Sequence, residues 1–327
     1  MPRPRALLAP ASEATALVVA DLDPALLARS EAMAERPRSA ATSKAYASDW
    51  RTFTTWCKGF GLSSLPAAEG TIAAFLVTLR DRGLRHSSIA RSYASIRATH
   101  AEAAAPLPTL ASVRNVLENI GREIGTAPRP KAPLMAAELK RIARATDEDR
   151  LGALRDRALL LVGFAAALRR SELVGLDVGD VKFMEDGLEV NIRKSKTDQA
   201  GAGRVVGVPH GTKGSCPVRS LRAWLDASGL KEGPLFRGVT RNGHMLEDRL
   251  QGRAVARIVK RVVEGAGLDS DEYSGHSLRA GLATSAAKHG ASLATIMACT
   301  GHKSERIAMK YIRHGQLFDV TAAEGLL

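Results

Sequence analysis

The segment GTAPRPKAPLM, residues 125–135, divides the chain because it holds three prolines and two cations. Proline lacks a backbone donor and has a fixed φ, so a run this rich in proline continues neither a helix nor a sheet. A chain of 327 residues is also long for a single core. We therefore expect a flexible Ala-rich extension at 1–37, a first domain at 38–125, a linker at 126–134 and a second domain at 135–327.

Aromatic residues in the first domain recur every three or four positions, which is the period of one helix face. The stripe runs through Tyr46, Trp50, Phe53, Trp56 and Phe60. Its regularity favours the buried face of a helix at 43–60 over a platform for stacking bases. Similar apolar spacing predicts helices from Pro66 to Gly83, from Ser87, and over 110–124, which together form a compact helical domain.

The second domain interrupts its helical pattern with three short strand-like runs. They cover 181–183, 188–193 and 204–208, and turn-forming residues separate them. Helical spacing returns over 218–227, 248–264, 278–289, 293–298 and 305–312. The fold class that we predict is mainly α with a small antiparallel β-sheet, in two domains.

The chain is strongly basic, since Lys and Arg outnumber Asp and Glu by 47 to 34 and the net charge is +13. An excess of this size favours a polyanionic partner, most often nucleic acid, over a basic surface without a partner. Between Pro37 and Pro130 the local balance is 12 to 6. Lys44, Arg82 and Arg91 are candidate DNA contacts there, and ordinary surface charge is the alternative for each.

Other kinds of site lack the residues that they need. The three cysteines are widely separated and form no CxxC pair, so we expect neither a disulfide nor a zinc framework. No HExxH or GxxxxGK[ST] motif occurs, and no carboxylate cluster suits two-metal chemistry, so we expect no metal or other cofactor. No run of 18 apolar residues occurs, so we expect no membrane-spanning helix. For the N-terminus, a signal peptide is a weaker interpretation than a flexible extension. The expected location is therefore the cytoplasm, on DNA and not at a membrane.

Five side chains in the second domain suit chemistry on a phosphodiester. They are Arg169 in LRRSEL, His276 and Arg279 in GHSLRAG, His302 in TGHKS and Tyr311 in MKYIRHG. Guanidinium groups offer planar forks of donors that match phosphate oxygens. A phenol has a pKa of about 10, so its ionisation at pH 7 costs about 4 kcal/mol, and it needs nearby cations or a base to act as a nucleophile. The set indicates a DNA strand-transfer enzyme.

Each of these residues also has a plain structural interpretation. A lone histidine is more often a core or helix-start residue than a reactive one. Tyr311 alone is an ordinary amphipathic tyrosine, and Arg169 with Arg170 could be two solvated charges at a helix end. Five such coincidences along one chain are implausible, so the set favours the chemical interpretation.

The order and spacing of the motifs resemble those of the tyrosine recombinase, or phage integrase, family. LRRSEL, a lysine in RKSKTDQAG, HSLR, GH and a tyrosine nine positions beyond are similar to the family's site. WCK at 56–58, LPA at 65–67 and RGL at 82–84 resemble its helical core-binding domain. The resemblance implies a C-shaped clamp, in which a core-binding domain and an integrase-type catalytic domain close around duplex DNA.

The resemblance implies that Arg169 and Arg279 bind the non-bridging oxygens of the scissile phosphate and that Tyr311 is the nucleophile. Glu172 matches an acidic position that orients a neighbour. Arg170 stands where the family usually has an apolar residue. Arg169 and Arg170 are therefore both candidates for the first of the family's two phosphate-binding arginines. The spacing to SEL favours Arg169.

The remaining members of the implied site handle protons and contact the phosphate. Lys196 matches the hairpin lysine that protonates the departing 5′ oxygen, and Lys194, two residues away on the same face, is the alternative. The resemblance implies proton transfer or phosphate contact for His276. It implies a hydrogen bond from His302 to the phosphate.

By resemblance, the reaction proceeds through a 3′-phosphotyrosyl intermediate, without ATP or metal, on double-stranded DNA with an inverted-repeat recombination site. The implied assembly is a homotetramer on two DNA sites. The apolar tail after Tyr311 either docks on a neighbouring protomer or folds back on its own domain. The alternatives are a type IB topoisomerase, which the helical first domain disfavours, and a non-catalytic DNA-binding protein of the same fold, which the intact site disfavours.

Overall fold

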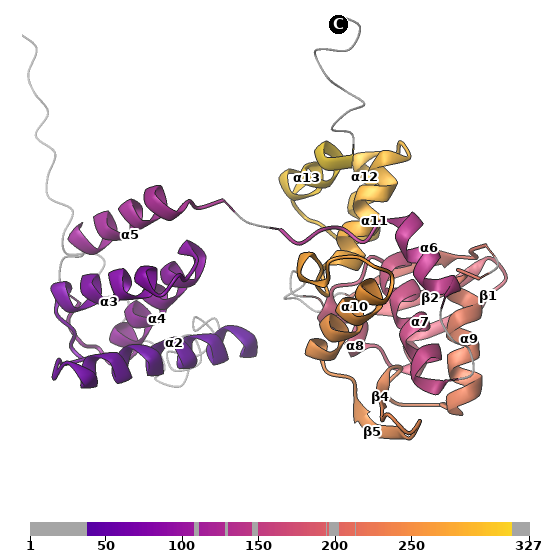
Figure 1. Ribbon diagram of the computed structural model, residues 1–327, viewed down its shortest axis with the longest axis horizontal. Coiled ribbons are helices and arrows are strands. Elements are labelled where there is room, and N and C mark those ends of the chain that lie inside the picture. Colours follow the sequence, from indigo (N-terminus) through magenta and orange to yellow (C-terminus); the bar gives the residue numbers. More distant parts are fainter. Residues whose placement is uncertain are drawn as a thin grey trace, which may run out of the picture. The chain divides into compact units, whose positions relative to one another are not determined.

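The computed structural model describes residues 38–107, 111–127, 130–145, 150–193, 195, 203–212 and 214–315. Its contacts divide the chain into two units, Met1–Pro128 and Arg129–Leu327 (Figure 1). The described elements are mainly helices with a small antiparallel sheet, which confirms the predicted fold class. The expected extension at 1–37, the two hairpin lysines Lys194 and Lys196, and the apolar tail at 316–327 lie outside the described residues.

Helices make up the described elements of the first unit: α2 (Ala40–Gly59), α3 (Glu69–Asp81), α4 (His86–Glu102) and α5 (Ala111–Ile124). Ser39 caps α2, since its side chain accepts a hydrogen bond from the backbone N of Thr42 at 3.2 Å. Gly83 follows α3 with φ of 76°, a left-handed conformation that glycine adopts without steric cost. The helices lie where the apolar spacing predicted them.

Aromatic rings fill the centre of the first unit. Phe53 and Phe75 are fully buried, and their ring centroids lie 5.0 Å apart. Trp56 packs on Phe75 with a centroid distance of 5.4 Å. Phe60, by contrast, is 68% exposed, because it follows the last turn of α2 as the C-cap residue. The prediction that the whole aromatic stripe is core is therefore wrong at Phe60.

The second unit begins with α6 (Ala136–Arg144), α7 (Leu151–Ala165) and α8 (Arg170–Gly175). Strands β1 (Val181–Met184), β2 (Gly187–Ile192) and β3 (Arg204–Pro209) follow and pair antiparallel in this order, so the predicted sheet is confirmed. Val190 on β2 lies opposite Val181 on one side and Val206 on the other, and these valines belong to the core. Further along lie α9 (Pro217–Ser228), β4 (Arg237–Val239), β5 (Met245–Arg249), α10 (Gly252–Gly265), α11 (Ser277–Lys288), α12 (Leu293–Thr300) and α13 (Glu305–Gly315).

A second hairpin, β4–β5, stands where no strand was predicted. Its turn contains Asn242 and Gly243, and Gly243 has φ of 83°. The backbone N of Thr240 donates to the carbonyl oxygen of His244 at 2.8 Å. Asn-Gly between short extended runs is a strong hairpin signal. The helix predicted at 248–264 begins later than expected, because β5 continues to Arg249.

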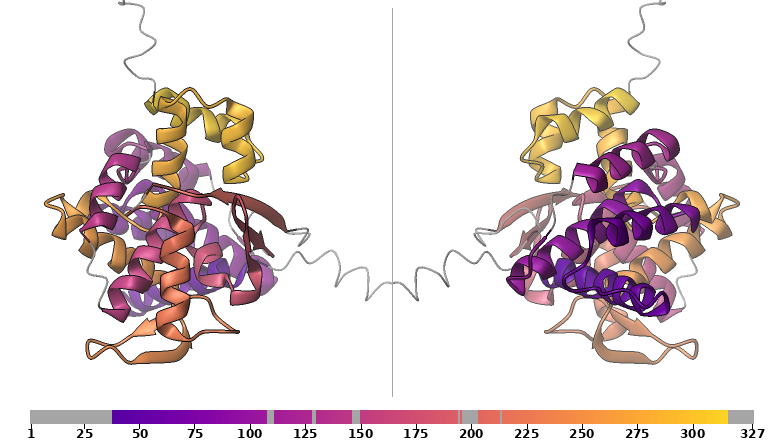
Figure 2. Two further views of the ribbon diagram at one scale, coloured as in Figure 1. Left: turned by 90° about the vertical axis from the view of Figure 1, so that its right-hand side faces the viewer. Right: turned by 90° about the vertical axis from the view of Figure 1, so that its left-hand side faces the viewer.

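The first residues of the second unit lie across α11. The backbone N of Leu134 donates to the carbonyl oxygen of Ser277 at 2.9 Å, and Leu134 is fully buried. Gly281 permits this crossing, since a Cβ there would stand 1.8 Å from the carbonyl oxygen of Leu134. Helices α11, α12 and α13 pack on one another, and Figure 2 shows them in gold and yellow at one end of this unit.

The core of the second unit is mostly aliphatic around the fully buried Trp224. The Trp224 Nε1 donates to the carbonyl oxygen of Leu235 at 2.9 Å, so its polar atom is satisfied inside the core. Within the described ranges, none of the helices combines the length and the apolar character that crossing a membrane requires.

Candidate active site

Arg169 and Glu172 form the first part of the site, at the start of α8. The backbone N of Arg169 donates to Glu172 Oε2 at 2.9 Å, and Arg169 Nη1 donates to Glu172 Oε1 at 2.6 Å. A glutamate three residues after the N-cap often accepts from the N-cap backbone, so the local sequence fixes this pair. Arg169 Nη1 also donates to Ser195 Oγ at 2.7 Å, which connects α8 to the segment after β2.

The carboxylate of Glu172 is the centre of this network. Its side chain is 1% exposed, and it also accepts from Ser195 Oγ at 2.8 Å and from Arg204 Nη2 at 3.3 Å. Burial alone would raise the pKa of Glu172, but hydrogen bonds from Arg169 and Ser195 hold it below its ordinary value. Glu172 is therefore ionised at neutral pH and offsets part of the surrounding positive charge.

Arg279 joins the site from the first turn of α11. The residue is 6% exposed, and its Nη1 donates to the carbonyl oxygen of Ala167 at 2.8 Å. Its Nη2 is buried and has no partner among the residues that the structure describes. Burial, followed by the charge of Arg169, lowers the pKa of Arg279 to about 10. A buried donor without a partner is costly, so this guanidinium suits an anion such as a phosphate oxygen.

His302 follows α12 and is neutral at pH 7. Its Nδ1 lies 2.8 Å from Thr300 Oγ1, whose hydroxyl donates to the carbonyl oxygen of Ile296 at 2.6 Å. Because that bond uses the one hydroxyl proton of Thr300, we assign the ring proton to Nδ1 of His302, which leaves a lone pair on Nε2. Burial and the charges of nearby arginines, Arg279 first among them, lower the pKa of His302 to about 4.

Tyr311 lies on α13 with its ring against His302. The two ring centroids are 5.7 Å apart and the planes differ by 20°. Tyr311 also packs against the small buried cluster of Ala283, Ala287 and Ile296 from α11 and α12. The phenol is held by packing and is still partly exposed.

His276 and the hairpin lysines stand differently with respect to this cluster. His276 is the N-cap residue of α11 and is exposed, and its backbone N donates to Ser274 Oγ at 3.2 Å. The HSLR spacing places it at the same helix end as Arg279. Lys196 and its alternative Lys194 lie outside the described residues. The structure thus brings together the predicted residues Arg169, Glu172, Arg279, His302 and Tyr311.

The two candidates for the first arginine have different surroundings. Arg169 contacts Glu172 and Ser195, as described above. Arg170 is exposed, and its aliphatic stem lies so close to Gly252 and Gly275 that a Cβ at either glycine would stand 3.4–3.5 Å from Arg170 Cγ. The spacing to SEL and the contacts therefore favour the same residue, Arg169.

Sequence reasoning missed Arg204, Ser195 and Thr300. Arg204 is the first residue of β3, and its guanidinium reaches both Glu172 and the carbonyl oxygen of Cys299. An arginine at the start of a short strand is usually a surface charge, so no local pattern distinguishes it. Thr300 had a usable signal, since a hydroxyl two residues from a candidate histidine can fix its tautomer.

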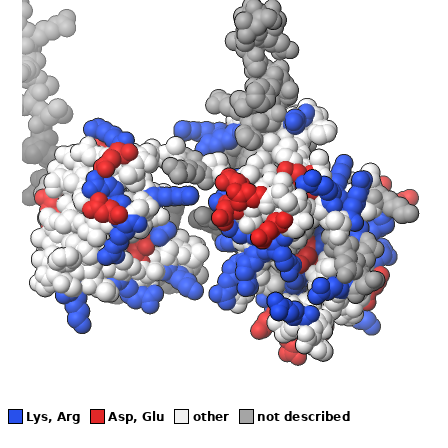
Figure 3. Space-filling model, viewed as in Figure 1, with Lys and Arg blue, Asp and Glu red and all other residues white. Residues whose placement is uncertain are grey.

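The predicted DNA contacts of the first unit also differ in their partners. Lys44 is exposed on α2, and Arg82 is the exposed C-cap residue of α3. Arg91 Nε and Nη2 donate to the two carboxylate oxygens of Asp49 at 2.7 and 3.1 Å, which joins α4 to α2. Figure 3 shows Lys and Arg side chains on the surface of each unit, with Asp and Glu among them.

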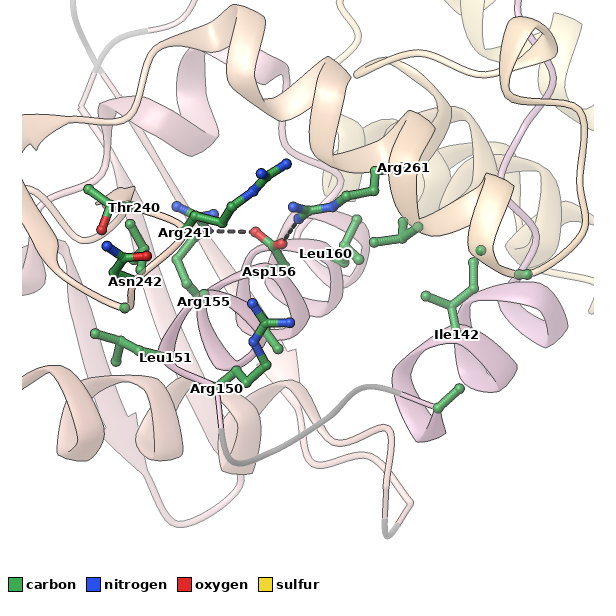
Figure 4. A pocket seen from close by; sticks show the side chains of 18 of the residues that line it. Ile142, Arg150, Leu151, Arg155, Asp156, Leu160, Thr240, Arg241, Asn242 and Arg261 are labelled. Atoms are coloured by element: carbon green, nitrogen blue, oxygen red, sulfur yellow. Dashed lines mark hydrogen bonds and ion pairs between the residues drawn. The ribbon is translucent and has the colours of Figure 1, made fainter.

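A cavity of about 1180 Å³ lies elsewhere in the second unit, among α6, α7, the β4–β5 turn and the end of α10. Figure 4 shows the buried Asp156 with Arg155 and Arg261 donating to its carboxylate. Burial raises the pKa of Asp156, and the two arginines oppose that rise. Of the described residues that line the cavity, none belongs to the predicted site. The site around Glu172 is therefore separate from this cavity.

Sequence comparison matches both units to one family. The Phage integrase family matches residues 133–316, and the Phage integrase, N-terminal SAM-like domain matches residues 31–105. An integrase/recombinase XerD homologue of Selenomonas ruminantium is 39% identical over 290 residues, which are 87% of this chain and 84% of that protein. The recombinase Cre of Escherichia phage P1 is 27% identical over 283 residues, which are 81% of each chain.

Two solved structures share the fold. The XerH site-specific recombinase bound to a palindromic difH substrate has a TM-score of 0.60 and 18% identity, over 79% of this chain and 72% of that chain. A lambda integrase tetramer bound to a Holliday junction has a TM-score of 0.59 and 18% identity, over 88% of this chain and 75% of that chain. At this identity the likeness concerns the fold.

Proposed function

The chain belongs to the phage integrase family, and on this premise we propose that Tyr311 is the nucleophile with which it breaks DNA. The protein is a tyrosine recombinase, an enzyme that cleaves DNA at a specific site and rejoins it. Attack by Tyr311 Oη forms a bond to phosphorus and breaks the bond from phosphorus to the 5′ oxygen. The products are a 3′-phosphotyrosyl link and a strand with a free 5′ hydroxyl.

Arg169 and Arg279 bind the two non-bridging oxygens of the scissile phosphate. Charge on these oxygens grows in the transition state, so prepositioned guanidinium donors stabilise that state more than the ground state. Glu172 accepts a hydrogen bond from Arg169 Nη1 and so fixes this guanidinium. Arg279 offers its Nη2 as a donor, since this atom has no partner among the described residues. Each charge-assisted contact is worth about 1.5–3 kcal/mol.

Two protons move during cleavage. The phenolic proton leaves Tyr311 as the oxygen attacks, and His276, exposed at the start of α11, is the candidate acceptor. The departing 5′ oxygen takes up a proton from Lys196, with Lys194 as the alternative donor. His302 contacts the phosphate beside Tyr311.

In the second step, the 5′ hydroxyl of a partner strand attacks the phosphotyrosyl link, so the bond energy is retained and neither ATP nor a metal is used.

One observation carries this proposal: residues from separate elements meet around a single buried carboxylate. Arg169 is the N-cap residue of α8, Arg279 lies on α11, and their charges help to lower the pKa of His302. His302 in turn stacks on Tyr311 from α13. A cationic cluster with a phenol at its edge matches the needs of phosphoryl transfer to tyrosine.

The substrate that we propose is double-stranded DNA with an inverted-repeat site, bound by a homotetramer across two sites. Lys44, Arg82 and Arg91 contact the DNA backbone from the first unit. The palindromic substrate of XerH and the lambda integrase tetramer on a Holliday junction support this arrangement. Such a substrate places the protein on the nucleoid, in the cytoplasm.

A nicked suicide substrate tests the nucleophile, and duplexes selected by binding from a random pool supply its sequence. Loss of the short strand traps the covalent state, so the wild type should yield a protein–DNA adduct whose nucleotide-bearing peptide contains Tyr311. Tyr311→Phe should bind the DNA and form no adduct. An adduct in Tyr311→Phe, or on another peptide, overturns the assignment. Exchange between two duplexes, as opposed to relaxation of supercoils alone, distinguishes recombination from topoisomerase activity.

A further inference from the structure

Arg204 lies between the Arg169–Glu172 pair and the end of α12, which His302 follows. Its Nη1 donates to the carbonyl oxygen of Cys299 at 2.6 Å, and its Nη2 donates to Glu172 Oε2 at 3.3 Å. The Arg204 side chain is 18% exposed. One guanidinium therefore connects β3, α8 and the last turn of α12.

The carbonyl oxygen of Cys299 is an acceptor that α12 leaves available. The last carbonyls of a helix have no amide four residues ahead, and partial negative charge gathers at that end. Here Gly301, with φ of 63°, closes the helix, and its backbone N donates to the carbonyl oxygen of Met297 at 2.7 Å. A cation at the Cys299 carbonyl oxygen gives this acceptor a donor and complements the helix dipole, so Arg204 stabilises the C-terminal end of α12.

The turn that presents His302 packs directly on Arg204. A Cβ at Gly301 would stand 3.0 Å from Arg204 Nε and 3.2 Å from its Cδ and Cζ. That Nε is buried and has no partner among the described residues, and each Nη already holds a protein oxygen. Both Nη atoms of Arg204 are thus committed to protein oxygens, whereas Arg279 has an Nη2 without a partner among the described residues.

We infer that Arg204 is a positioning residue for recombination, which holds His302, and through it Tyr311, at a fixed place relative to Arg169; this inference rests on the proposed function. Glu172 ties the bridge to Arg169 at one end. At the other end the bridge holds the turn whose Thr300 hydroxyl bonds His302.

Loss of this bridge leaves each half folded by its own packing. Helices α12 and α13 would keep their contacts with α11, and α8 would keep those with α7 and α10. The two halves could then shift against each other. A displacement of about 1 Å at reacting atoms can reduce a rate about 100-fold. We therefore expect an effect on the chemical step that exceeds the effect on DNA binding.

Two substitutions separate the charge of Arg204 from its shape. Arg204→Lys keeps the charge but has one nitrogen, which cannot reach both oxygens, and Arg204→Met removes the charge. With saturating suicide substrate, the single-turnover cleavage rate should fall about 10- to 100-fold in Arg204→Lys and further in Arg204→Met. The Kd for the same DNA, measured by fluorescence anisotropy, should change less than about threefold.

Arg249→Lys is the matched control. Arg249 Nη1 donates to the carbonyl oxygens of Val174 and Leu176 at 2.8 and 2.9 Å, and its Nη2 bonds the carboxylate of Asp177. It thus joins backbone carbonyls to a carboxylate, as Arg204 does, but bonds none of the proposed site residues that the structure describes. The cleavage rate of Arg249→Lys should stay within about twofold of the wild type.

The titration of His302 adds a readout that a general loss of stability would not move. Burial and the charges of Arg279, Arg169 and Arg204 lower the pKa of His302, while Glu172 opposes them. An NMR titration of Arg204→Met should therefore give a higher pKa for His302 than the wild type, and Arg204→Lys should give a smaller rise.

The outcomes separate this inference from the function on which it rests. If the wild type forms no adduct at Tyr311, the proposed function fails. If the adduct forms but Arg204→Lys cleaves at the wild-type rate, Arg204 is not a positioning residue and the function stands. Should Arg204→Met fail to fold, Arg204→Gln replaces it, because its shorter, neutral side chain cannot bond both Glu172 and the Cys299 carbonyl. The same loss of rate at constant Kd is expected there, and a wild-type rate overturns the inference.

Discussion

The imidazole of His302 stacks on the phenol ring of Tyr311, with centroids 5.7 Å apart and planes inclined by 20°. Burial comes first and the neighbouring arginines second among the causes that lower the pKa of His302 to about 4. A charged imidazole here would add to a cluster that is already cationic. The site therefore keeps His302 neutral, with a proton on Nδ1 and an acceptor at Nε2.

We expect DNA binding to be coupled to proton uptake at His302. A bound phosphate offsets the arginine charges, so the pKa of His302 should rise in the complex. Because Nδ1 keeps its proton, Nε2 can donate only when the ring is protonated. Calorimetry at about pH 6, in buffers of different ionisation enthalpy, should show uptake of up to about one proton, which His302→Asn abolishes. Equal uptake in His302→Asn would assign the proton to another group.

The same pKa makes stability depend on pH. The folded-state pKa of about 4 lies below the ordinary 6.5, so the unfolded chain binds this proton more readily between these values. The free energy of unfolding should therefore fall as the pH drops through this window, and His302 should contribute no pH dependence above it. Urea titrations at several pH values should show a smaller decline for His302→Asn. A decline identical to that of the wild type would mean that His302 has an ordinary pKa.

Glu172→Gln should destabilise the second unit and slow cleavage. The substitution leaves Arg169 and Arg204 without their buried counter-charge. It also places the NH₂ group of the glutamine beside the N–H and O–H donors of Arg169, Ser195 and Arg204. Breaking a buried ion pair typically costs about 3–5 kcal/mol, and we expect a loss of about 3 kcal/mol in the free energy of unfolding. The lowered pKa of Glu172 predicts that its stabilisation is present at neutral pH and is lost as the pH falls from 4.5 through its folded-state pKa.

Urea denaturation measures this loss, and Glu189→Gln is its control. Glu189 lies on β2 with its side chain 38% exposed and pairs with Lys182 at 3.4 Å. A surface pair of this kind contributes about 0–1 kcal/mol, so Glu189→Gln should change stability little. Equal losses in the two variants would show that burial of Glu172 adds nothing.

The helices and the three-stranded sheet were predictable because each depends on local spacing. The aromatic residues of α2 recur every three or four positions and predict a helix at 43–60, whereas α2 covers Ala40–Gly59 and begins earlier because Ser39 caps it. The β4–β5 hairpin was missed although Asn242 and Gly243 form a known turn pair. Its flanking runs are short and charged, so they lacked the apolar alternation of β2 and β3.

The site was predictable where residue type and motif coincide, as they do for Arg169, Arg279, His302 and Tyr311. Arg204 could not be found in this way. Its role depends on contacts with Glu172 and Cys299, which are 32 and 95 residues away in the sequence. Such contacts arise when β3, α8 and α12 pack together, and no local pattern encodes them.

Arg91 should serve both as an ion-pair partner and as a DNA contact. Its pairing with Asp49 joins two helices of the first unit. Arg91→Ala should reduce the slope of log K for DNA against log salt by about one unit, as Lys44→Ala and Arg82→Ala should. Asp49→Asn frees the Arg91 guanidinium and should strengthen DNA binding. A salt slope that Arg91→Ala leaves unchanged would limit Arg91 to the ion pair.

Gly281→Ala should be among the most damaging small substitutions in the chain. The new Cβ would stand 1.8 Å from the carbonyl oxygen of Leu134 and 2.7 Å from its carbonyl carbon. Backbone atoms cannot rotate away as a side chain can, so residues 130–135 must lift from α11. Lifting breaks the bond from Leu134 N to the Ser277 carbonyl and exposes a fully buried leucine.

Overpacking costs about 1–3 kcal/mol, and exposing a buried leucine adds about 1.5–3 kcal/mol. We therefore expect Gly281→Ala to lower the free energy of unfolding by roughly 3 kcal/mol or more, measured by urea denaturation. Gly265→Ala is the matched control, because a Cβ at Gly265, in the last turn of α10, meets nothing within 4 Å. It should leave stability unchanged or raise it by up to about 1 kcal/mol. Since α11 carries Arg279 and supports Tyr311, DNA cleavage by Gly281→Ala should be slower as well. Equal stability of the two variants would show that the backbone at Leu134 moves away from α11 at no cost in free energy.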